Sequence, residues 1–172
     1  MNAAPRRLAE PRRAEARRAQ ILGAAAACFR TRGFHGASIA AISTAAGMSA
    51  GHIYHYFENK EAIIAGIVAK DLDHVLDMSA QVRSSPDVLG AVIDAVADGV
   101  HRALDTEAAG IKLEIVAEAS RNEQIAAIVR AADAQGMASL IETLRSIRPS
   151  RGHDDDDPDL AAMAEVIAAL FE

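Results

Sequence analysis

Apolar residues recur at intervals of three and four positions along most of this chain, the spacing that lines one face of an α-helix. The clearest such stretches cover residues 12–32, 122–147 and 160–171. Composition agrees, because the chain is rich in alanine, has 3% aromatic residues and lacks tryptophan, whereas strands draw on aromatic and β-branched residues. An all-α fold is expected, and 172 residues suffice for one sizeable core or two small ones.

The N-terminal part is predicted to be a three-helix domain over residues 12–57. Pro5 and Pro11 interrupt any earlier helix, so residues 1–11 are expected to form a flexible basic arm. The first helix is expected to end at Gly33, and the next two are a helix-turn-helix over residues 38–57.

Within this helix-turn-helix, Ser38 and Ser49 are the expected N-caps, and Gly47 can adopt the positive φ of a tight turn. Ile53 and Tyr56 are expected to face inward. The residues left on or near the outer face of the second helix are Ala50, Gly51, His52, Tyr54 and His55. Small and polar side chains at these positions suit the major groove of DNA.

Residues 58–172 are predicted to form an antiparallel helical bundle. Ser85 is the expected N-cap of its second helix, with Pro86 at the first helical position, and Asn122 is the expected N-cap of the long helix. The apolar stripe expected to face inward after Pro86 comprises Val88, Leu89, Val92, Ile93, Val96, Val100 and Leu104. The last helix stays apolar to its final residues, and a second subunit is the expected cover.

Charge is divided unevenly along the chain. Residues 1–60 hold nine basic and three acidic residues, a net charge of +6, whereas the whole chain carries −6 and the remainder therefore −12. A basic N-terminal third can approach phosphates, while an acidic remainder is repelled by them. The overall charge alone would argue against nucleic acid, but its distribution favours DNA as the partner.

The sequence gives little support for other kinds of site, and no metal or cofactor is expected. The single cysteine, Cys28, excludes an internal disulfide and is expected to be a small core residue. The apolar run over residues 21–29 has helical spacing, so it is not expected to be a signal peptide, and no stretch reaches the 18 apolar residues of a membrane span. The run His153–Asp157 is expected to be a solvated loop rather than a metal site.

These motifs together resemble the TetR family of bacterial transcriptional regulators. The matching segments are Gly33-Phe34, Ser38-Ile39, Ala46-Gly-Met-Ser49, Gly51-His-Ile-Tyr-His-Tyr-Phe57 and Asn59-Lys-Glu61, and the likeness is close over residues 15–65. The resemblance implies a repressor that binds a palindromic operator in double-stranded DNA as a homodimer, and the lack of a possible disulfide fits a cytoplasmic protein. It also implies a small-molecule effector that binds the C-terminal bundle and releases the DNA.

The family pattern, carried over residue by residue, assigns DNA contacts to the two capping serines, the second helix and the start of the next. The set is Ser38, Ser49, Ala50, Gly51, His52, Tyr54, His55, Tyr56 and Lys60. The serines and Lys60 are expected at phosphates, Gly51 and His52 at base edges, and Tyr56 is either a phosphate contact or a core residue. The arginines at 6, 7, 12 and 13 either follow the minor groove or form a solvated tail.

The expected effector site consists of polar residues that interrupt the apolar faces of the bundle: His74, Met78, His101, Glu114 and Glu118. A buried carboxylate among them would favour a cationic ligand. Two other interpretations stay open, because a glutamate every four residues is typical of a solvated face and Glu118 could instead pair with Arg121.

An enzyme is not expected, because the sequence has no P-loop, glycine-rich dinucleotide turn, metal-spaced His/Cys set or Ser-His-Asp grouping. The alternative to a ligand-responsive regulator is an effector-independent DNA-binding or partner-binding architectural module, which would have no closed cavity in its bundle. Many members of the family continue for another helix. Either the helices over residues 139–147 and 160–171 suffice for dimerisation, or the sequence is truncated and the dimer weakened.

Overall fold

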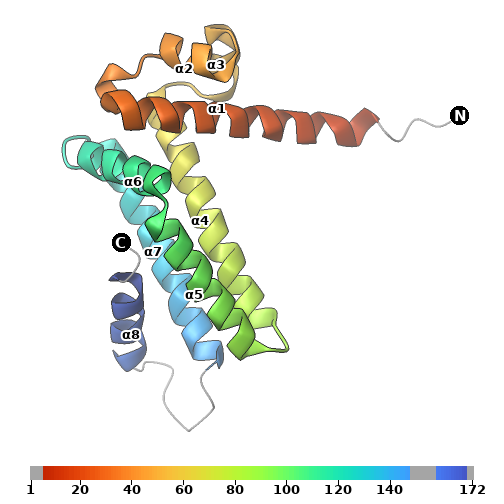
Figure 1. The fold of residues 1–172 in the computed structure, drawn as a ribbon, viewed down its shortest axis with the longest axis vertical. Helices are drawn as coiled ribbons and strands as arrows, with labels where there is room; N and C mark the ends of the chain where they lie inside the picture. Colours follow the sequence, from red (N-terminus) through yellow and green to blue (C-terminus); the bar gives the residue numbers. More distant parts are fainter. Residues whose placement is uncertain (1–5, 148–157, 170–172) are drawn as a thin grey trace, which may run out of the picture. The chain divides into compact units, whose positions relative to one another are not determined.

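The computed structural model describes residues 6–147 and 158–169, with side chains over residues 12–147 and 159–169. In these residues the chain forms eight helices and no strand, which confirms the all-α prediction (Figure 1). The helices are α1 (Arg6–Gly36), α2 (Ile39–Ala46), α3 (Ala50–Tyr56), α4 (Lys60–Ser84), α5 (Val88–Leu104), α6 (Thr106–Ala119), α7 (Glu123–Ile147) and α8 (Pro158–Ala169). The predicted loop at His153–Asp157 and the end of the last predicted helix lie outside the described residues.

Two compact units share these helices. The first comprises Met1–Ile67 with Gly110–Ile125, and the second comprises Val68–Ala109 with Ala126–Glu172. Three helices, α4, α6 and α7, contribute residues to both. This division differs from the expected boundary after residue 57, since it places the first turns of α4 and most of α6 with the helix-turn-helix.

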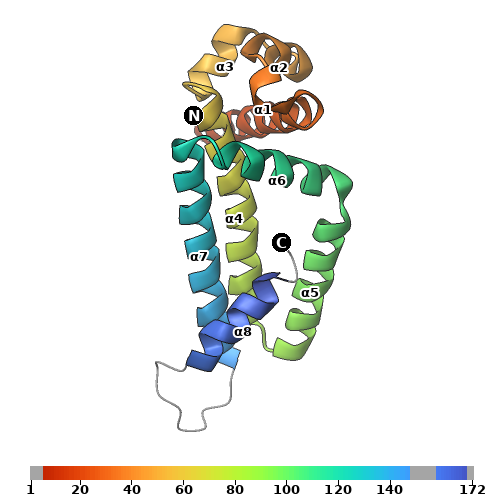
Figure 2. The same ribbon diagram turned by 90° about the vertical axis from the view of Figure 1, so that its left-hand side faces the viewer.

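In the first unit, α2 and α3 lie on one side of α1, and the second half of α6 lies on the other side (Figures 1 and 2). Apolar residues from all the helices of this unit make the core. Its largest fully buried apolar side chains are Ile21, Phe29, Ile42, Ile53, Ile63, Ile64 and Ile125. Cys28 is buried among the core residues, as expected.

The first helix is longer than predicted. It begins at Arg6 instead of Arg12, so the expected interruption at Pro11 is wrong. Pro11 lies in the second turn of α1, where proline has a helical φ but removes one backbone hydrogen bond, and this loss does not end the helix. At the other end, Gly33 breaks the helix with φ 69° and ψ 167°, as the sequence indicated, but residues to Gly36 add a further turn.

The predicted caps of the helix-turn-helix are confirmed. The Ser38 Oγ accepts a hydrogen bond from the Ala41 N–H at 3.1 Å, and the Ser49 Oγ accepts one from the His52 N–H at 3.2 Å. Gly47 ends α2 in the left-handed conformation, with φ 62° and ψ 34°. These local signals fix where α2 stops and α3 starts.

Gly47→Ala is expected to lower the free energy of unfolding by about 1 kcal/mol, because an L side chain disfavours the left-handed conformation. Urea unfolding measures the change. The matched control is Gly23→Ala, at an exposed position in α1 where an added Cβ meets nothing within 4 Å. There alanine is expected to raise stability by up to about 1 kcal/mol. Equal effects at the two sites would contradict the assigned turn.

The second unit contains the later parts of α4 and α7, together with α5 and α8. Successive helices alternate in direction, as predicted for an antiparallel bundle (Figures 1 and 2). The Arg83 guanidinium on α4 donates to the Thr143 hydroxyl on α7 at 2.8 Å, and Thr143 itself is buried. This hydrogen bond joins α4 to α7 between their apolar faces.

Two details of α5 correct the sequence analysis. Its N-cap is Asp87, whose carboxylate accepts from the Gly90 N–H at 3.0 Å, and not Ser85, whose hydroxyl instead bonds the Asp87 backbone. The predicted inward stripe is also wrong for the single chain, because α5 has no buried residue and Leu89 and Leu104 are 72% and 76% exposed. Polar pairs join α5 to α4, and the apolar stripe of α5 is exposed to solvent in the single chain.

Candidate nucleic-acid interface

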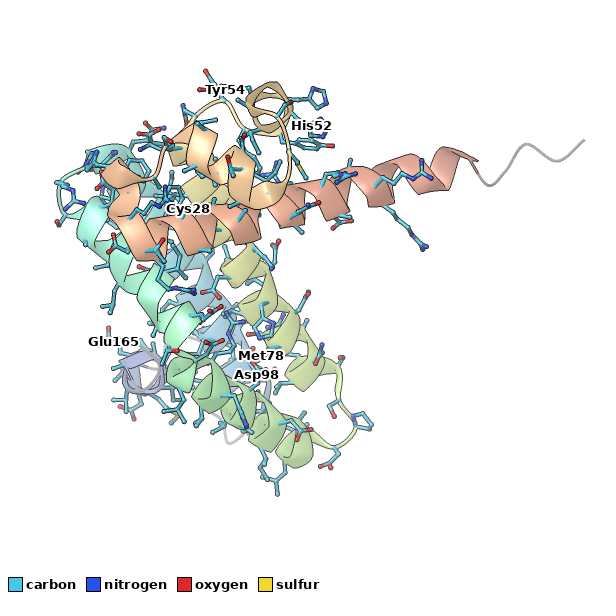
Figure 3. All side chains as sticks on the ribbon, turned by 45° about the horizontal axis from the view of Figure 1, so that its top comes forward. Cys28, His52, Tyr54, Met78, Asp98 and Glu165 are labelled. Carbon is cyan, nitrogen blue, oxygen red and sulfur yellow. The ribbon has the colours of Figure 1, made fainter. Side chains whose placement is uncertain are left out.

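The second helix of the helix-turn-helix, α3, presents almost all of its length to solvent. Ile53 is its buried anchor in the core. Tyr56 is half-buried, and this exposure is compatible with both roles considered for it, a phosphate contact and a core residue. The exposed residues are Ala50, Gly51, His52, Tyr54 and His55, the same set that the sequence placed outside. Figure 3 shows His52 and Tyr54 extending from opposite sides of α3, and both are exposed.

Three rings form a cluster on α3, which we call the histidine–tyrosine cluster: His52, His55 and Tyr56. The ring centroid of Tyr56 lies 5.5 Å from that of His52 and 5.2 Å from that of His55, and the two imidazoles are 6.5 Å apart. The His55 ring meets Tyr56 edge to face, at 86°. Such contacts restrict the rings, so the two imidazoles are presented together rather than independently.

Two contacts from α1 position the helix-turn-helix. The Gln20 side-chain amide donates to the carbonyl of Ala46 in the last turn of α2, at 2.8 Å. The Arg18 guanidinium lies 4.5 Å from the centroid of the Phe57 ring, directly after α3. Both contacts were missed in the sequence, where Gln20 is one polar residue beside an apolar run. A side chain that satisfies a helix-end carbonyl far along the chain leaves no local signal.

The capping serines keep a donor for DNA. Ser38 and Ser49 are exposed, and each uses its hydroxyl oxygen to accept from its own helix. A hydroxyl that accepts still has its O–H to give, and a phosphate oxygen is a suitable acceptor. This geometry is compatible with the phosphate contacts expected of both serines, which remain predictions.

Lys60, at the start of α4, has an intramolecular role that the sequence did not indicate. Its Nζ donates to the carbonyl of Phe34 at 2.6 Å and lies 4.4 Å from the centroid of the Phe34 ring. Lys60 therefore holds the last turn of α1. Its predicted contact with a phosphate would use its remaining donors.

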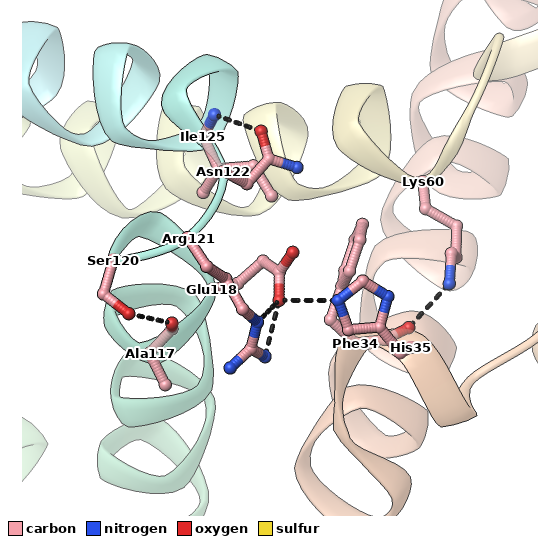
Figure 4. Close-up of polar contacts among 9 residues, drawn as sticks. All are labelled: Phe34, His35, Lys60, Ala117, Glu118, Ser120, Arg121, Asn122 and Ile125. Atoms are coloured by element: carbon pink, nitrogen blue, oxygen red, sulfur yellow. Dashed lines mark hydrogen bonds and ion pairs between the residues drawn. The ribbon is translucent and has the colours of Figure 1, made fainter.

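The other side of this turn meets α6 in the same unit (Figure 4). Glu118 is 1% exposed, and its Oε2 lies 2.6 Å from the Arg121 guanidinium and 3.3 Å from His35 Nε2. The predicted pairing of Glu118 with Arg121 is confirmed, and the solvated-face interpretation is wrong for Glu118. A buried carboxylate needs such partners because desolvation of an unpaired charge is costly.

The five expected effector-site residues are divided between the units. Glu114 and Glu118 belong to the first, whereas His74, Met78 and His101 belong to the second. In the second unit His74 Nε2 lies 2.8 Å from the Asp98 carboxylate, and Arg102 pairs with Asp71. His101 Nδ1 lies 2.8 Å from the carbonyl of Ala97 on its own helix. The effector site remains a prediction.

A groove in the second unit is lined by apolar residues of α7 and α8: Leu144, Ile147, Leu160 and Met163. None of the expected effector residues lines it. Among the described residues, no three His, Cys, Asp or Glu side chains are grouped so as to hold a metal ion. No helix in that part of the chain is long and apolar enough to cross a membrane.

Two family models match the sequence. Residues 21–67 match the model for bacterial regulatory proteins of the tetR family, and residues 87–172 match the C-terminal model of BetI-type transcriptional repressors. The first match coincides with the core of α1, the helix-turn-helix and the start of α4. The second match covers the helices from α5 onward.

Curated proteins similar to the chain are transcriptional regulators and not enzymes. The HTH-type transcriptional regulator UidR of Escherichia coli (strain K12) is 32% identical over 117 residues, which are 68% of this chain and 59% of UidR. The HTH-type transcriptional repressor Rv1474c of Mycobacterium tuberculosis is 34% identical over 82 residues, 48% of this chain and 42% of that protein. The alignment with UidR thus spans about three fifths of that relative.

Solved structures similar to this chain cover a longer part of it than the curated relatives do. Salmonella enterica GusR has a TM-score of 0.73 at 28% identity, covering 90% of this chain and 79% of GusR. A putative transcriptional regulator from Pseudomonas aeruginosa PAO1 has a TM-score of 0.74 at 25% identity, covering 91% and 76%. The likeness therefore includes both the helix-turn-helix and helices of the bundle.

Proposed function

Because the chain belongs to the TetR family of bacterial regulatory proteins, we propose that it is a cytoplasmic transcriptional repressor that binds a palindromic DNA operator as a homodimer. The observation that carries the proposal is α3, capped by Ser49, anchored by Ile53 and exposed elsewhere. Its N-terminal residues approach base edges, while Ser38, Ser49 and Lys60 meet phosphates. Two copies bind half-sites about one helical turn apart.

Release by a small-molecule effector is part of the same proposal. The second unit carries the polar pair His74–Asp98 on helices whose other faces are apolar, a combination suited to an orienting contact with a bound molecule. For the dimer, Met163 and Val166 on α8 are 46% and 65% exposed beside the apolar groove. Apolar side chains in such a row are suited to burial against a second copy.

Selection of duplexes from a random-sequence DNA pool tests the proposal directly. The expected result is an enriched palindrome with half-sites about 10 base pairs apart. A pool that yields no enriched sequence would contradict a sequence-specific repressor, and an enriched sequence without two-fold symmetry would contradict the dimer. Binding that no small molecule alters would favour the effector-independent module.

His52→Ala and Lys60→Ala are expected to weaken binding in different ways. Loss of His52 removes a base contact and should reduce discrimination by about 1–3 kcal/mol at particular base pairs. Loss of Lys60 should weaken binding to all sequences and lower the salt slope by about one. Gel-shift titrations at several salt concentrations measure both. Unaltered affinity in both variants would contradict the assigned interface.

A further inference from the structure

The helix assigned to base reading has no permanent charge. Its sequence, Ala-Gly-His-Ile-Tyr-His-Tyr, lacks Arg, Lys, Asn and Gln, the side chains that make bidentate contacts with guanine and adenine. The hydrogen-bonding side chains on α3 are therefore two imidazoles and two phenols. Of these, His52 and His55 are exposed and lie three residues apart, which places them next to each other on the helix surface.

The permanent charges on the neighbouring elements lie on α1 and at the start of α4, outside α3 itself. On α1, the Arg18 guanidinium covers the Phe57 ring, and Arg17 donates to Gln20 at 3.1 Å. At the start of α4, the Lys60 ammonium is bonded to Phe34. The other titratable residues on and directly after α3 are the phenols of Tyr54 and Tyr56 and the carboxylate of Glu58, with Glu61 on α4, whereas α2 has no ionisable residue.

We propose that His52 and His55 bind DNA as protonated imidazoles, so that the protein takes up protons as it binds and its affinity falls as the pH rises. The inference rests on the proposed role of α3 at the operator. A protonated imidazole has two N–H donors and a positive charge, whereas the neutral ring has one donor and one acceptor. The acceptors that select it are guanine N7 and O6 or a phosphate oxygen, all of which stabilise the charged form.

The size of the effect follows from imidazole chemistry. Histidine side chains in general change charge between about pH 5 and pH 8. A contact made only by the charged form therefore loses about tenfold or more in affinity between pH 6 and pH 8. The two histidines together give an expected loss approaching a hundredfold. The contacts of both imidazoles with Tyr56 keep the two rings on the same face of α3, so both can meet DNA in one binding event.

The test measures the dissociation constant of the full chain for a duplex selected from a random pool, by fluorescence anisotropy at constant ionic strength from pH 6 to pH 8. The wild type is expected to weaken steeply with rising pH. His52→Gln and His55→Gln should each remove about half of the logarithmic change, and the double variant should remove it. His35→Gln, at the exposed imidazole beside Glu118, is the control and should keep the wild-type profile.

A second pair of substitutions, His52→Lys with His55→Lys, keeps the test decisive if the glutamine variants bind too weakly. Permanent charges should give binding at pH 8 without the wild-type pH dependence. Duplexes containing 7-deazaguanine separate the two sources of acceptor, since they abolish the pH dependence only if guanine N7 is the partner. Binding by the wild type that does not vary with pH, or a double variant that keeps the variation, overturns the inference alone. Absence of binding at every pH overturns the proposed function as well.

Discussion

Arg121→Met is expected to lower the free energy of unfolding by about 2 kcal/mol, because it removes the main partner of a buried carboxylate, although Arg121 is itself 51% exposed and solvent screens the pair. Glu118 is 1% exposed, and the Arg121 guanidinium lies 2.6 Å from its Oε2. Methionine replaces the apolar stem of the arginine. The Glu118 carboxylate then has His35 as its remaining partner, which is 3.3 Å away and 72% exposed. Urea unfolding followed by circular dichroism measures the change.

The double variant Glu118→Met with Arg121→Met separates the pair from its surroundings. Only Glu118 is buried in this pair, and an apolar side chain in its place needs no charged partner, so most of the lost stability should return. Arg102→Met, which breaks the exposed pair with Asp71, is the matched control and should change stability by less than about 1 kcal/mol. If the double variant is as unstable as Arg121→Met, an unpaired charge on Glu118 is not the cause of the instability.

The parts of the fold that the sequence predicts well are those encoded within a few residues. Ser38 and Ser49 cap helices by bonding an N–H three residues on, and Gly47 supplies a backbone conformation that other residues avoid. Asn122 caps α7 in the same way, accepting from the N–H groups of Gln124 and Ile125. These interactions need no knowledge of the rest of the chain, and the exposed face of α3 follows from them.

The parts that the sequence did not predict depend on partners far along the chain. The spacing of Glu114 and Glu118 is that of a solvated helix face, whereas Glu118 is buried and has a partner, His35, from the end of α1 that the spacing does not indicate. Lys60 is a similar case. Its sequence context indicates a phosphate-binding residue, whereas in the structure its ammonium donates to the carbonyl of Phe34. Periodicity reports which residues share a face, but not which element covers it.

The apolar stripe of α5 is the converse case, because its periodicity predicted burial and the stripe is exposed. Its spacing is among the most regular in the chain, yet Leu89, Ile93 and Leu104 are each more than half exposed. The contacts that hold α5 to α4 are instead the polar pairs His74–Asp98 and Arg102–Asp71. A regular apolar stripe therefore predicts a helix with more certainty than it predicts burial within the same chain.

Gly66→Val is expected to lower the free energy of unfolding by about 2–3 kcal/mol, because α4 approaches α1 too closely there to admit a side chain. A Cβ at Gly66 would lie 2.8 Å from Leu22 Cδ2 and 3.0 Å from Phe57 Cε1, and Gly66 is buried. Phe57 is also the C-cap of α3, so its displacement should weaken DNA binding beyond the loss of stability. Unfolding and anisotropy titrations on the same preparation measure both effects.

Gly136→Val, in the interior of α7, is the control for the helix propensity of valine. A Cβ there comes no closer than 3.9 Å to Leu72, an ordinary contact, so stability should change by less than about 0.5 kcal/mol. Leu22→Ala combined with Gly66→Val should recover part of the stability, because it removes the nearest clashing atom while Phe57 stays in place. If the combined variant regains stability but not DNA affinity, the ring of Phe57 is what couples this packing to α3. If Gly66→Val unfolds no more easily than Gly136→Val, the close approach of α4 to α1 is wrong.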